Sequence, residues 1–269
     1  MSKFTFTRKD KVGKPRECGY MKYDRVSGDS AALYFYGDIC GESWESRYFD
    51  EDKAPQDIVD FLSEINEGGG TKRLDVYINS GGGSVFGGIA IYNILSRYQG
   101  EKVAHIDGIA ASIAGIIPFA CDKVIARASS QLMLHKPWSI CAGNADDMKK
   151  CIESLNICEQ SIISIYAEHA VNGTTADKIK SMIDRETWLT CEQASQYFDI
   201  EIEPGEAAAA CISESYGLYR NAPESLRKSA QPEPEEQADI HRKRKLQLMH
   251  DCMSSSFQNK ERRYINDKT

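Results

Sequence analysis

Three short stretches of the sequence hold residue types that could carry out chemistry together. The first is the glycine-rich run Asn79-Ser-Gly-Gly-Gly-Ser84. A turn of this kind can hold a phosphate or present backbone N–H groups to an oxyanion. It can equally be a strand-to-helix turn that only needs positive φ. The run lacks the lysine of a P-loop and the spacing of a dinucleotide-binding fingerprint.

The other two stretches contain a serine and a histidine. Ser112 lies within Gly108-Ile-Ala-Ala-Ser-Ile-Ala-Gly115, where small neighbours leave room for a substrate, although such a serine can also serve only in packing. His135 follows the apolar run Leu132-Met-Leu134 and can be either a base or a structural histidine. A serine hydroxyl is a weak nucleophile until a base accepts its proton, and an imidazole with a pKa of about 6.5 suits that task.

Alternating strand and helix patterns surround these stretches and predict an α/β fold with crossover connections. The predicted strands are 31–36, 74–79, 102–106, 123–126 and 132–134. The predicted helices are 55–66, 89–98, 109–121, 146–170, 175–184 and 191–198. The helix over 146–170 is long and amphipathic, so it has an apolar stripe to bury.

The chain divides by composition into three zones. Residues 1–30 form a polar N-terminal segment, in which the alternation of Phe4 and Phe6 predicts a short strand. Residues 31–220 carry the fold. Residues 221–269 form a charged tail with too few apolar side chains to build a core, so we expect it to be flexible. A short helix over 239–249 is compatible with this tail.

Composition excludes several classes of protein. The chain has 269 residues, 41% of them hydrophobic, and a net charge of −7. No run approaches the roughly 18–20 apolar residues of a membrane span, and Met1–Lys14 lacks the apolar core of a secretory signal. The charge argues against a nucleic-acid partner. The nine cysteines form no CxxC pair or zinc-ligand spacing, which predicts free thiols in a cytoplasm and no metal.

The order and spacing of the three stretches resemble the proteolytic subunit of the Clp protease family. The matching motifs are Val76-Tyr-Ile-Asn-Ser-Gly-Gly-Gly83, Gly108-Ile-Ala-Ala-Ser112 and Met133-Leu-His-Lys-Pro137, and the resemblance extends over about 33–203. It implies a fold of repeated β-β-α units with a protruding long helix. It also implies that Ser112 is the nucleophile, that His135 is the general base, and that the N–H groups of Gly82 and Ile113 form the oxyanion hole. No cofactor is implied.

The resemblance assigns the third member of the catalytic triad less directly. Alignment of Trp188-Leu-Thr190 with the family's Phe-Leu-Ser puts Glu186 at the usual aspartate, and Asp184 is the alternative. Glutamate is one methylene longer than aspartate, so it can still orient the imidazole from a slightly retracted backbone. Two other departures are Gly81, where the family has proline in the glycine turn, and Phe198, where it has glycine.

Within this family the sequence is most similar to the Clp-like head maturation proteases of tailed phages. The resemblance is carried by Ile106-Asp-Gly108, Gly143-Asn-Ala-Asp146 and Glu186-Thr-Trp188. It implies a serine endopeptidase that forms a homo-oligomeric ring and cleaves capsid, portal or scaffold proteins in the host cytoplasm or the prohead. The alternatives are a housekeeping subunit that needs a Clp-type ATPase, and an inactive structural ring or scaffold subunit. A crotonase-type acyl-CoA enzyme would not need the Ser112–His135 pair.

Overall fold

The computed structural model describes residues 2–9, 15–23, 30–41, 53–67, 72–205 and 219–223. The chain divides into two compact units. One comprises Met1–Lys136 with Ile162–Ala230, and the other comprises Pro137–Ser161 with Gln231–Thr269. Every residue predicted to take part in the site belongs to the first unit. The predicted flexible tail lies outside the described residues from 224 onward.

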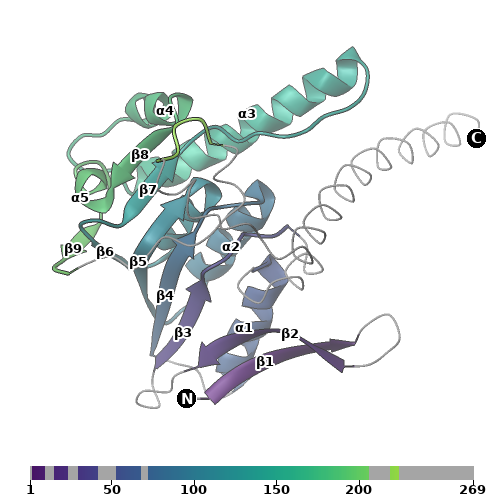
Figure 1. Cartoon of the computed structure of the whole chain (residues 1–269), viewed down its shortest axis with the longest axis vertical. Helices are drawn as coiled ribbons and strands as arrows, with labels where there is room; N and C mark the ends of the chain where they lie inside the picture. Colours follow the sequence, from purple (N-terminus) through teal and green to yellow (C-terminus); the bar gives the residue numbers. More distant parts are fainter. Residues whose placement is uncertain are drawn as a thin grey trace, which may run out of the picture. The chain divides into compact units, whose positions relative to one another are not determined.

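In its described residues, the first unit contains a seven-stranded, mainly parallel sheet with helical connections, as Figure 1 shows, and this arrangement confirms the α/β class. The strands run in the order β3 (Ser30–Phe35), β4 (Arg73–Ser80), β5 (Glu101–Ala111), β6 (Lys123–Arg127) and β9 (Glu201–Glu203). A further strand, β7 (Gln131–Leu134), pairs in parallel with β5, and β8 (Thr187–Thr190) pairs antiparallel with β7. The crossovers contain α1 (Pro55–Glu67), α2 (Val85–Ser96) and the 3-10 helix η1 (Ser112–Ala120).

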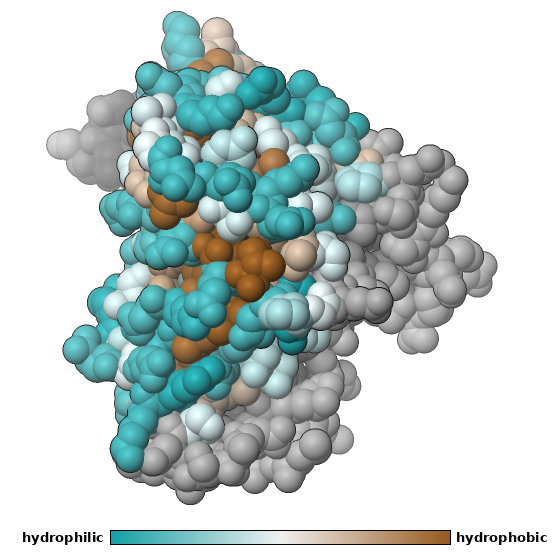
Figure 2. Space-filling model, turned by 90° about the vertical axis from the view of Figure 1, so that its left-hand side faces the viewer, coloured by the Kyte–Doolittle hydropathy of each residue, from teal (hydrophilic) through white to brown (hydrophobic). Residues whose placement is uncertain are grey.

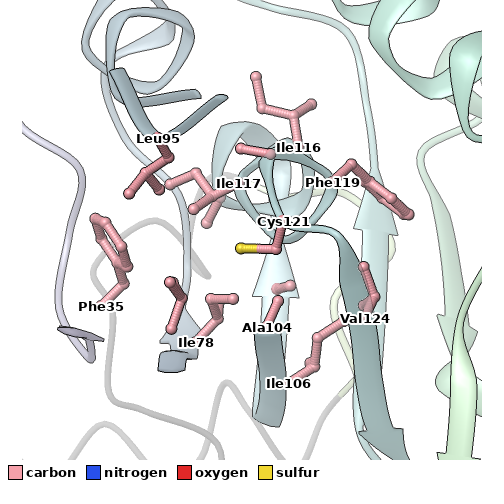
Figure 3. Close-up of a cluster of buried hydrophobic side chains, with 14 of the residues drawn as sticks. Phe35, Ile78, Leu95, Ala104, Ile106, Ile116, Ile117, Phe119, Cys121 and Val124 are labelled. Carbon is pink, nitrogen blue, oxygen red and sulfur yellow. The ribbon is translucent and has the colours of Figure 1, made fainter. Parts of the chain in front are cut away.

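The core lies between the sheet and the helices that connect its strands. Leu74, Val76 and Ile78 alternate along β4 and are fully buried, as the period of a strand requires. Figure 3 shows how this layer meets the helices in one buried cluster, which includes Phe35, Ile78, Leu95, Ala104, Ile106, Ile116, Ile117, Phe119, Cys121 and Val124. This packing fixes α2 and η1 on the sheet. Helix α2 follows the glycine turn, and η1 begins at Ser112.

Three predicted helices differ from the structure. The predicted helix 109–121 is wrong at its start, because Ile109–Ala111 belong to β5 and helical structure begins only at Ser112. Helix α2 begins at Val85 rather than 89, because the Ser84 side chain accepts a hydrogen bond from the Gly87 N–H and caps the helix there. The predicted helix 191–198 is shortened to one turn, α5 (Cys191–Ala194).

The N-terminal strand around Phe4 and Phe6 is confirmed as β1 (Ser2–Lys9), which pairs antiparallel with β2 (Pro15–Tyr23). Helix α3 (Ala145–Glu168) confirms the predicted long helix. Its residues up to Ser161 belong to the second unit, and Ile162–Glu168 belong to the first, where Tyr166 is fully buried. Among the described helices, none is long and apolar enough to cross a membrane.

Candidate active site

The ends of three neighbouring parallel strands bring the predicted residues together. In the register of the sheet, Ser80 of β4 lies beside Ala110 of β5, and Ala111 of β5 lies beside Met133 of β7. Parallel strands end at the same edge of a sheet, where ligand sites of α/β folds lie. The glycine turn, Ser112 and His135 follow these strands directly, so residues far apart in sequence meet at one edge.

Ser112 and His135 are in hydrogen-bond contact. Ser112 Oγ lies 2.6 Å from His135 Nε2, and both side chains are only partly buried. Ser112 has a φ of +54°, at the turn from β5 into η1. A non-glycine residue in this region costs roughly 1–3 kcal/mol, and such strain gathers at functional sites. The arrangement is that of a nucleophile whose proton can pass to an adjacent base.

The glycine turn lies directly against Ser112. Gly82 has a φ of +104°, and a Cβ added there would come within 2.7 Å of Ser112 Cβ and 2.8 Å of the Ala111 oxygen. Only glycine fits this position. The Gly82 N–H donates to Ser80 Oγ at 3.2 Å. Ile113 is the second residue of η1, and the first N–H groups of a helix have no acceptor within it. Both predicted oxyanion donors therefore flank Ser112, and their catalytic role stays a prediction.

Glu186 is brought to His135 by a strand that the sequence did not predict. Leu134 of β7 pairs with Thr187 of β8, so Glu186, just before β8, lies next to His135, just after β7. The Glu186 charge raises the pKa of His135, against the larger lowering effect of burial. Glu186 also has a positive φ of +51°, immediately after the C-cap of α4 (Ala176–Asp184).

The Glu186 carboxylate is held by backbone groups from far along the chain. Oε2 accepts from the Arg220 N–H at 2.8 Å, and Oε1 accepts from the Asn221 N–H at 2.6 Å and from Trp188 Nε1 at 3.3 Å. Within the described part of the chain, no hydrogen bond joins this carboxylate to the His135 ring. Its influence on the imidazole in this structure is therefore electrostatic.

Asp184 has different partners. Its carboxylate lies 2.8 Å from Lys136 Nζ and 3.1 Å from Lys180 Nζ. Hydrogen bonds from these two lysines lower the pKa of Asp184. The carboxylate whose charge raises the pKa of His135, against the larger lowering effect of burial, is that of Glu186. The geometry therefore favours Glu186 as the third member, which remains a prediction.

Burial of His135 sets an expectation for the pH dependence of activity. A general base must be neutral, and burial lowers the pKa of His135 below 6.5. The acid limb of kcat/KM should therefore fall below pH 6.5, so that more than half of the maximal value remains at that pH. A pH series of kcat/KM on a peptide without titrating groups measures this limb. A midpoint above 6.5 would contradict the expectation.

One contact of the site was missed from sequence. The ring of Tyr219 meets the ring of His135 edge to face, with centroids 4.9 Å apart, and also contacts Trp188. Tyr219 lies at the predicted border of the charged tail, beyond the stretch that resembles the family. No motif or periodicity marks it, and only the fold brings it back to the sheet edge.

Curated proteins from several organisms are similar to about half of this chain. A curated relative from Bacteroides fragilis, an ATP-dependent Clp protease proteolytic subunit, is 30% identical over 139 residues, which is 51% of this chain and 65% of the relative. A proteolytic subunit from Chlorella vulgaris is 29% identical over 55% of this chain and 73% of its own length. Another, from Streptomyces avermitilis, is 32% identical over 46% of this chain and 57% of its own.

The chain thus spans less than two thirds of the length of the Bacteroides fragilis relative. The model of the Clp protease family matches residues 49–198, a range that contains the glycine turn, Ser112, His135 and Glu186. This range covers more than half of the 269 residues. On this match, and on the arrangement of the three strand ends, the chain belongs to the Clp protease family.

Proposed function

We propose that this protein is a serine endopeptidase in which Ser112 is the nucleophile and His135 the general base. The observation that carries the proposal is the 2.6 Å contact between Ser112 Oγ and His135 Nε2, at a strained and partly exposed serine. We further propose residues 31–220 as the peptidase domain. Tyr219, which contacts the strands of the site, lies at the end of that range, and Ala222, which packs in the same small core, lies two residues beyond it.

The chemistry follows from the contacts. Ser112 Oγ attacks the carbonyl carbon of the scissile peptide bond while His135 Nε2 takes the hydroxyl proton. The carbonyl oxygen becomes an oxyanion, which accepts hydrogen bonds from the N–H groups of Gly82 and Ile113. To do so it replaces Ser80 Oγ, the present acceptor of the Gly82 N–H. Preorganised donors of this kind are often the largest single contribution to catalysis.

The second half of the reaction restores the enzyme. His135 gives its proton to the leaving amine, the C–N bond breaks, and the acyl group stays on Ser112 Oγ as an ester. A water molecule then loses a proton to His135 and attacks the ester, which releases the acid and returns the proton to Ser112. Glu186 stabilises the imidazolium that forms in each half, because its charge lies close enough to raise the pKa of His135.

For the substrate we propose structural proteins of a phage head: capsid, portal or scaffold proteins, cleaved in the host cytoplasm or the prohead. The support is the sequence similarity at 106–108, 143–146 and 186–188 described above. The alternative is an ATPase-dependent role, since the curated relatives are ATP-dependent subunits. An inactive ring or scaffold subunit is the third candidate, against which the Ser112–His135 contact argues.

A cleavage assay separates these roles. The purified chain is incubated with phage capsid, portal and scaffold proteins, and separately with an unfolded protein plus a Clp-type ATPase and ATP. Cleavage of a head protein without ATP supports head maturation. Cleavage only with the ATPase supports the housekeeping role. No cleavage and no labelling of Ser112 by a fluorophosphonate probe would leave the inactive ring subunit.

We also propose that the protein assembles into a homo-oligomeric ring. Four of the six large hydrophobic side chains exposed in the described residues belong to Pro137–Ser161: Trp138, Ile140, Ile152 and Ile157. Figure 2 shows one face of the molecule, on which hydrophobic residues form a patch among hydrophilic ones. Such uncovered apolar surface is typical of contacts between proteins. The support for copies of this chain as the occupant is the family to which it belongs.

Substitution of the exposed isoleucines of α3 should weaken this assembly. Ile152 and Ile157 are 57% and 67% exposed, so Ile152→Asp with Ile157→Asp removes apolar contact surface without opening the core. We expect a shift from oligomer to smaller species by light scattering at micromolar concentration. Ser154→Asp is the control, because Ser154 is exposed on the same helix and the change adds charge alone. A monomeric wild-type chain with full activity would refute the ring.

A further inference from the structure

The segment Tyr219–Ala222 packs against the strands that end at the proposed site. Tyr219 and Ala222 are buried, at 4% and 7% exposure, in a small core with Ile109, Ala111 and Met133. These three partners lie on β5 and β7, whose next residues are Ser112 and His135. The segment is therefore anchored at the sheet edge on its own side chains, close to the reacting groups.

Tyr219 contacts two parts of the site with one side chain. Its hydroxyl donates a buried hydrogen bond of 2.6 Å to the carbonyl oxygen of Gly81. Its ring lies against the His135 ring at an interplanar angle of 72°. The side chain therefore connects the glycine turn to the base, two parts of the site that come from different strands.

The hydrogen bond to Gly81 acts on the predicted oxyanion donor. The Gly81 C=O and the Gly82 N–H belong to the same planar peptide unit, so fixing the oxygen fixes the direction of the N–H. Hydrogen bonds in a chain also polarise one another, and the Gly82 N–H becomes a better donor when the Gly81 oxygen accepts one. Gly81 has no side chain to restrict this turn. The hydrogen bond from the Tyr219 hydroxyl, which comes from a distant part of the chain, restricts the orientation of the Gly81–Gly82 peptide instead.

The next two residues hold the proposed acid. Arg220 and Asn221 donate their backbone N–H groups to the two oxygens of Glu186. Asn221 Nδ2 donates to the backbone oxygens of Arg185 and Glu186, at 2.9 and 3.1 Å. These bonds fix both the carboxylate and the left-handed backbone of Glu186. The same short segment thus reaches the oxyanion peptide, the base and the acid.

We infer that Tyr219 is a positioning residue of the peptidase site, and that Tyr219–Ala222 holds the Gly81–Gly82 peptide, His135 and Glu186 in their working arrangement. The inference rests on the proposed function and adds to it a part of the chain beyond the family match. Tyr219 acts through the groups that it orients, whereas Ser112 and His135 react with the substrate.

The test is Tyr219→Phe, which removes the hydrogen bond to Gly81 and keeps the ring against His135. We expect kcat to fall about tenfold while KM changes less than about twofold, because the oxyanion forms only in the transition state. The affinity for a peptide boronate, whose tetrahedral adduct mimics that state, should fall by the same factor as kcat/KM. Tyr197→Phe is the control, since Tyr197 is partly exposed and its ring contacts Phe198 and Lys178.

Unchanged kcat and boronate affinity in a folded Tyr219→Phe chain would overturn the inference, and so would a higher kcat, which would mean that the segment obstructs the site. Labelling of wild-type Ser112 by a fluorophosphonate decides separately whether the proposed function holds.

A readout without turnover is the NMR titration of His135 in Ser112→Ala. There Tyr219→Ala should raise the pKa of His135 toward 6.5 by uncovering the ring. An unchanged titration would contradict the contact itself.

Discussion

Replacing Ser112 with alanine is expected to abolish peptide cleavage and to remove labelling by a fluorophosphonate probe. Loss of a nucleophile in a catalytic triad lowers kcat by roughly four to six orders of magnitude. The fold should survive, because alanine is smaller than serine and the neighbouring Ala111 and Ala114 are already buried at this turn. Cleavage rate, labelling and melting temperature, measured on the same preparations, give the result.

The matched control is Ser96→Ala. Ser96 is exposed, and its hydroxyl donates to the Tyr92 carbonyl within α2, away from Ser112 in the sequence, so full activity and full labelling are expected. If Ser112→Ala retained near-normal turnover, another group would be the nucleophile. If both variants lost activity together with their melting transitions, the loss would report folding instead of chemistry.

Glu186→Gln is expected to slow cleavage by roughly a hundredfold, and Asp184→Asn by less than about threefold. The amide removes the charge that stabilises the His135 imidazolium, and wrong orientation of the base in such triads costs up to about 10⁴-fold. We expect less here because the carboxylate bonds to Arg220 and Asn221 instead of the imidazole. Asp184→Asn loses ion pairs at a 39% exposed carboxylate, which contribute little to stability.

The same pair of variants gives a second, directional readout. The Glu186 charge raises the pKa of His135, so Glu186→Gln should lower that pKa and move the acid limb of kcat/KM further down in pH. Glu186→Asp keeps the charge and should retain part of the activity. A larger loss in Asp184→Asn would transfer the role to Asp184. Equally small losses in both would indicate that Ser112 and His135 work as a dyad.

Much of the fold could be predicted because the spacing of apolar residues along the sequence indicates which side of a strand or helix is buried. The strand around Leu74 and the helix around Ile58 and Phe61 follow the periods of their elements and are buried as expected. The helix predicted over 109–121 failed at its start because a run of small apolar residues suits a buried strand as well as a buried helix. β5 continues to Ala111 because it gains a second partner, β7, and that pairing depends on distant residues.

The site, like the fold, contains residues that the sequence predicted and residues that it did not. Ser112, His135 and Gly82 lie in motifs whose order could be recognised, and their proximity follows from parallel strands that end together. The position of Glu186 depends on β8, whose residues Thr187–Thr190 are all partly buried and carry no clear alternation. No motif or periodicity in the sequence predicted that Tyr219 would contact the site. Its role arises from tertiary contacts with β5 and β7, which composition and spacing do not encode.

The way in which β5 changes partners also divides the site into two halves. Val103 to Ile106 pair with β6, whereas only Ile109 to Ala111 pair with β7. The base and the acid are both carried by the β7–β8 pair, and the nucleophile and the glycine turn by β4 and β5. Only three residue pairs join β5 to β7. A shift of β7 along β5 would therefore break the contact between Ser112 and His135, while His135 and Glu186 kept their mutual distance. Among the described residues, Tyr219 connects these two halves, because its ring contacts His135 and its hydroxyl donates to the Gly81 carbonyl of the glycine turn.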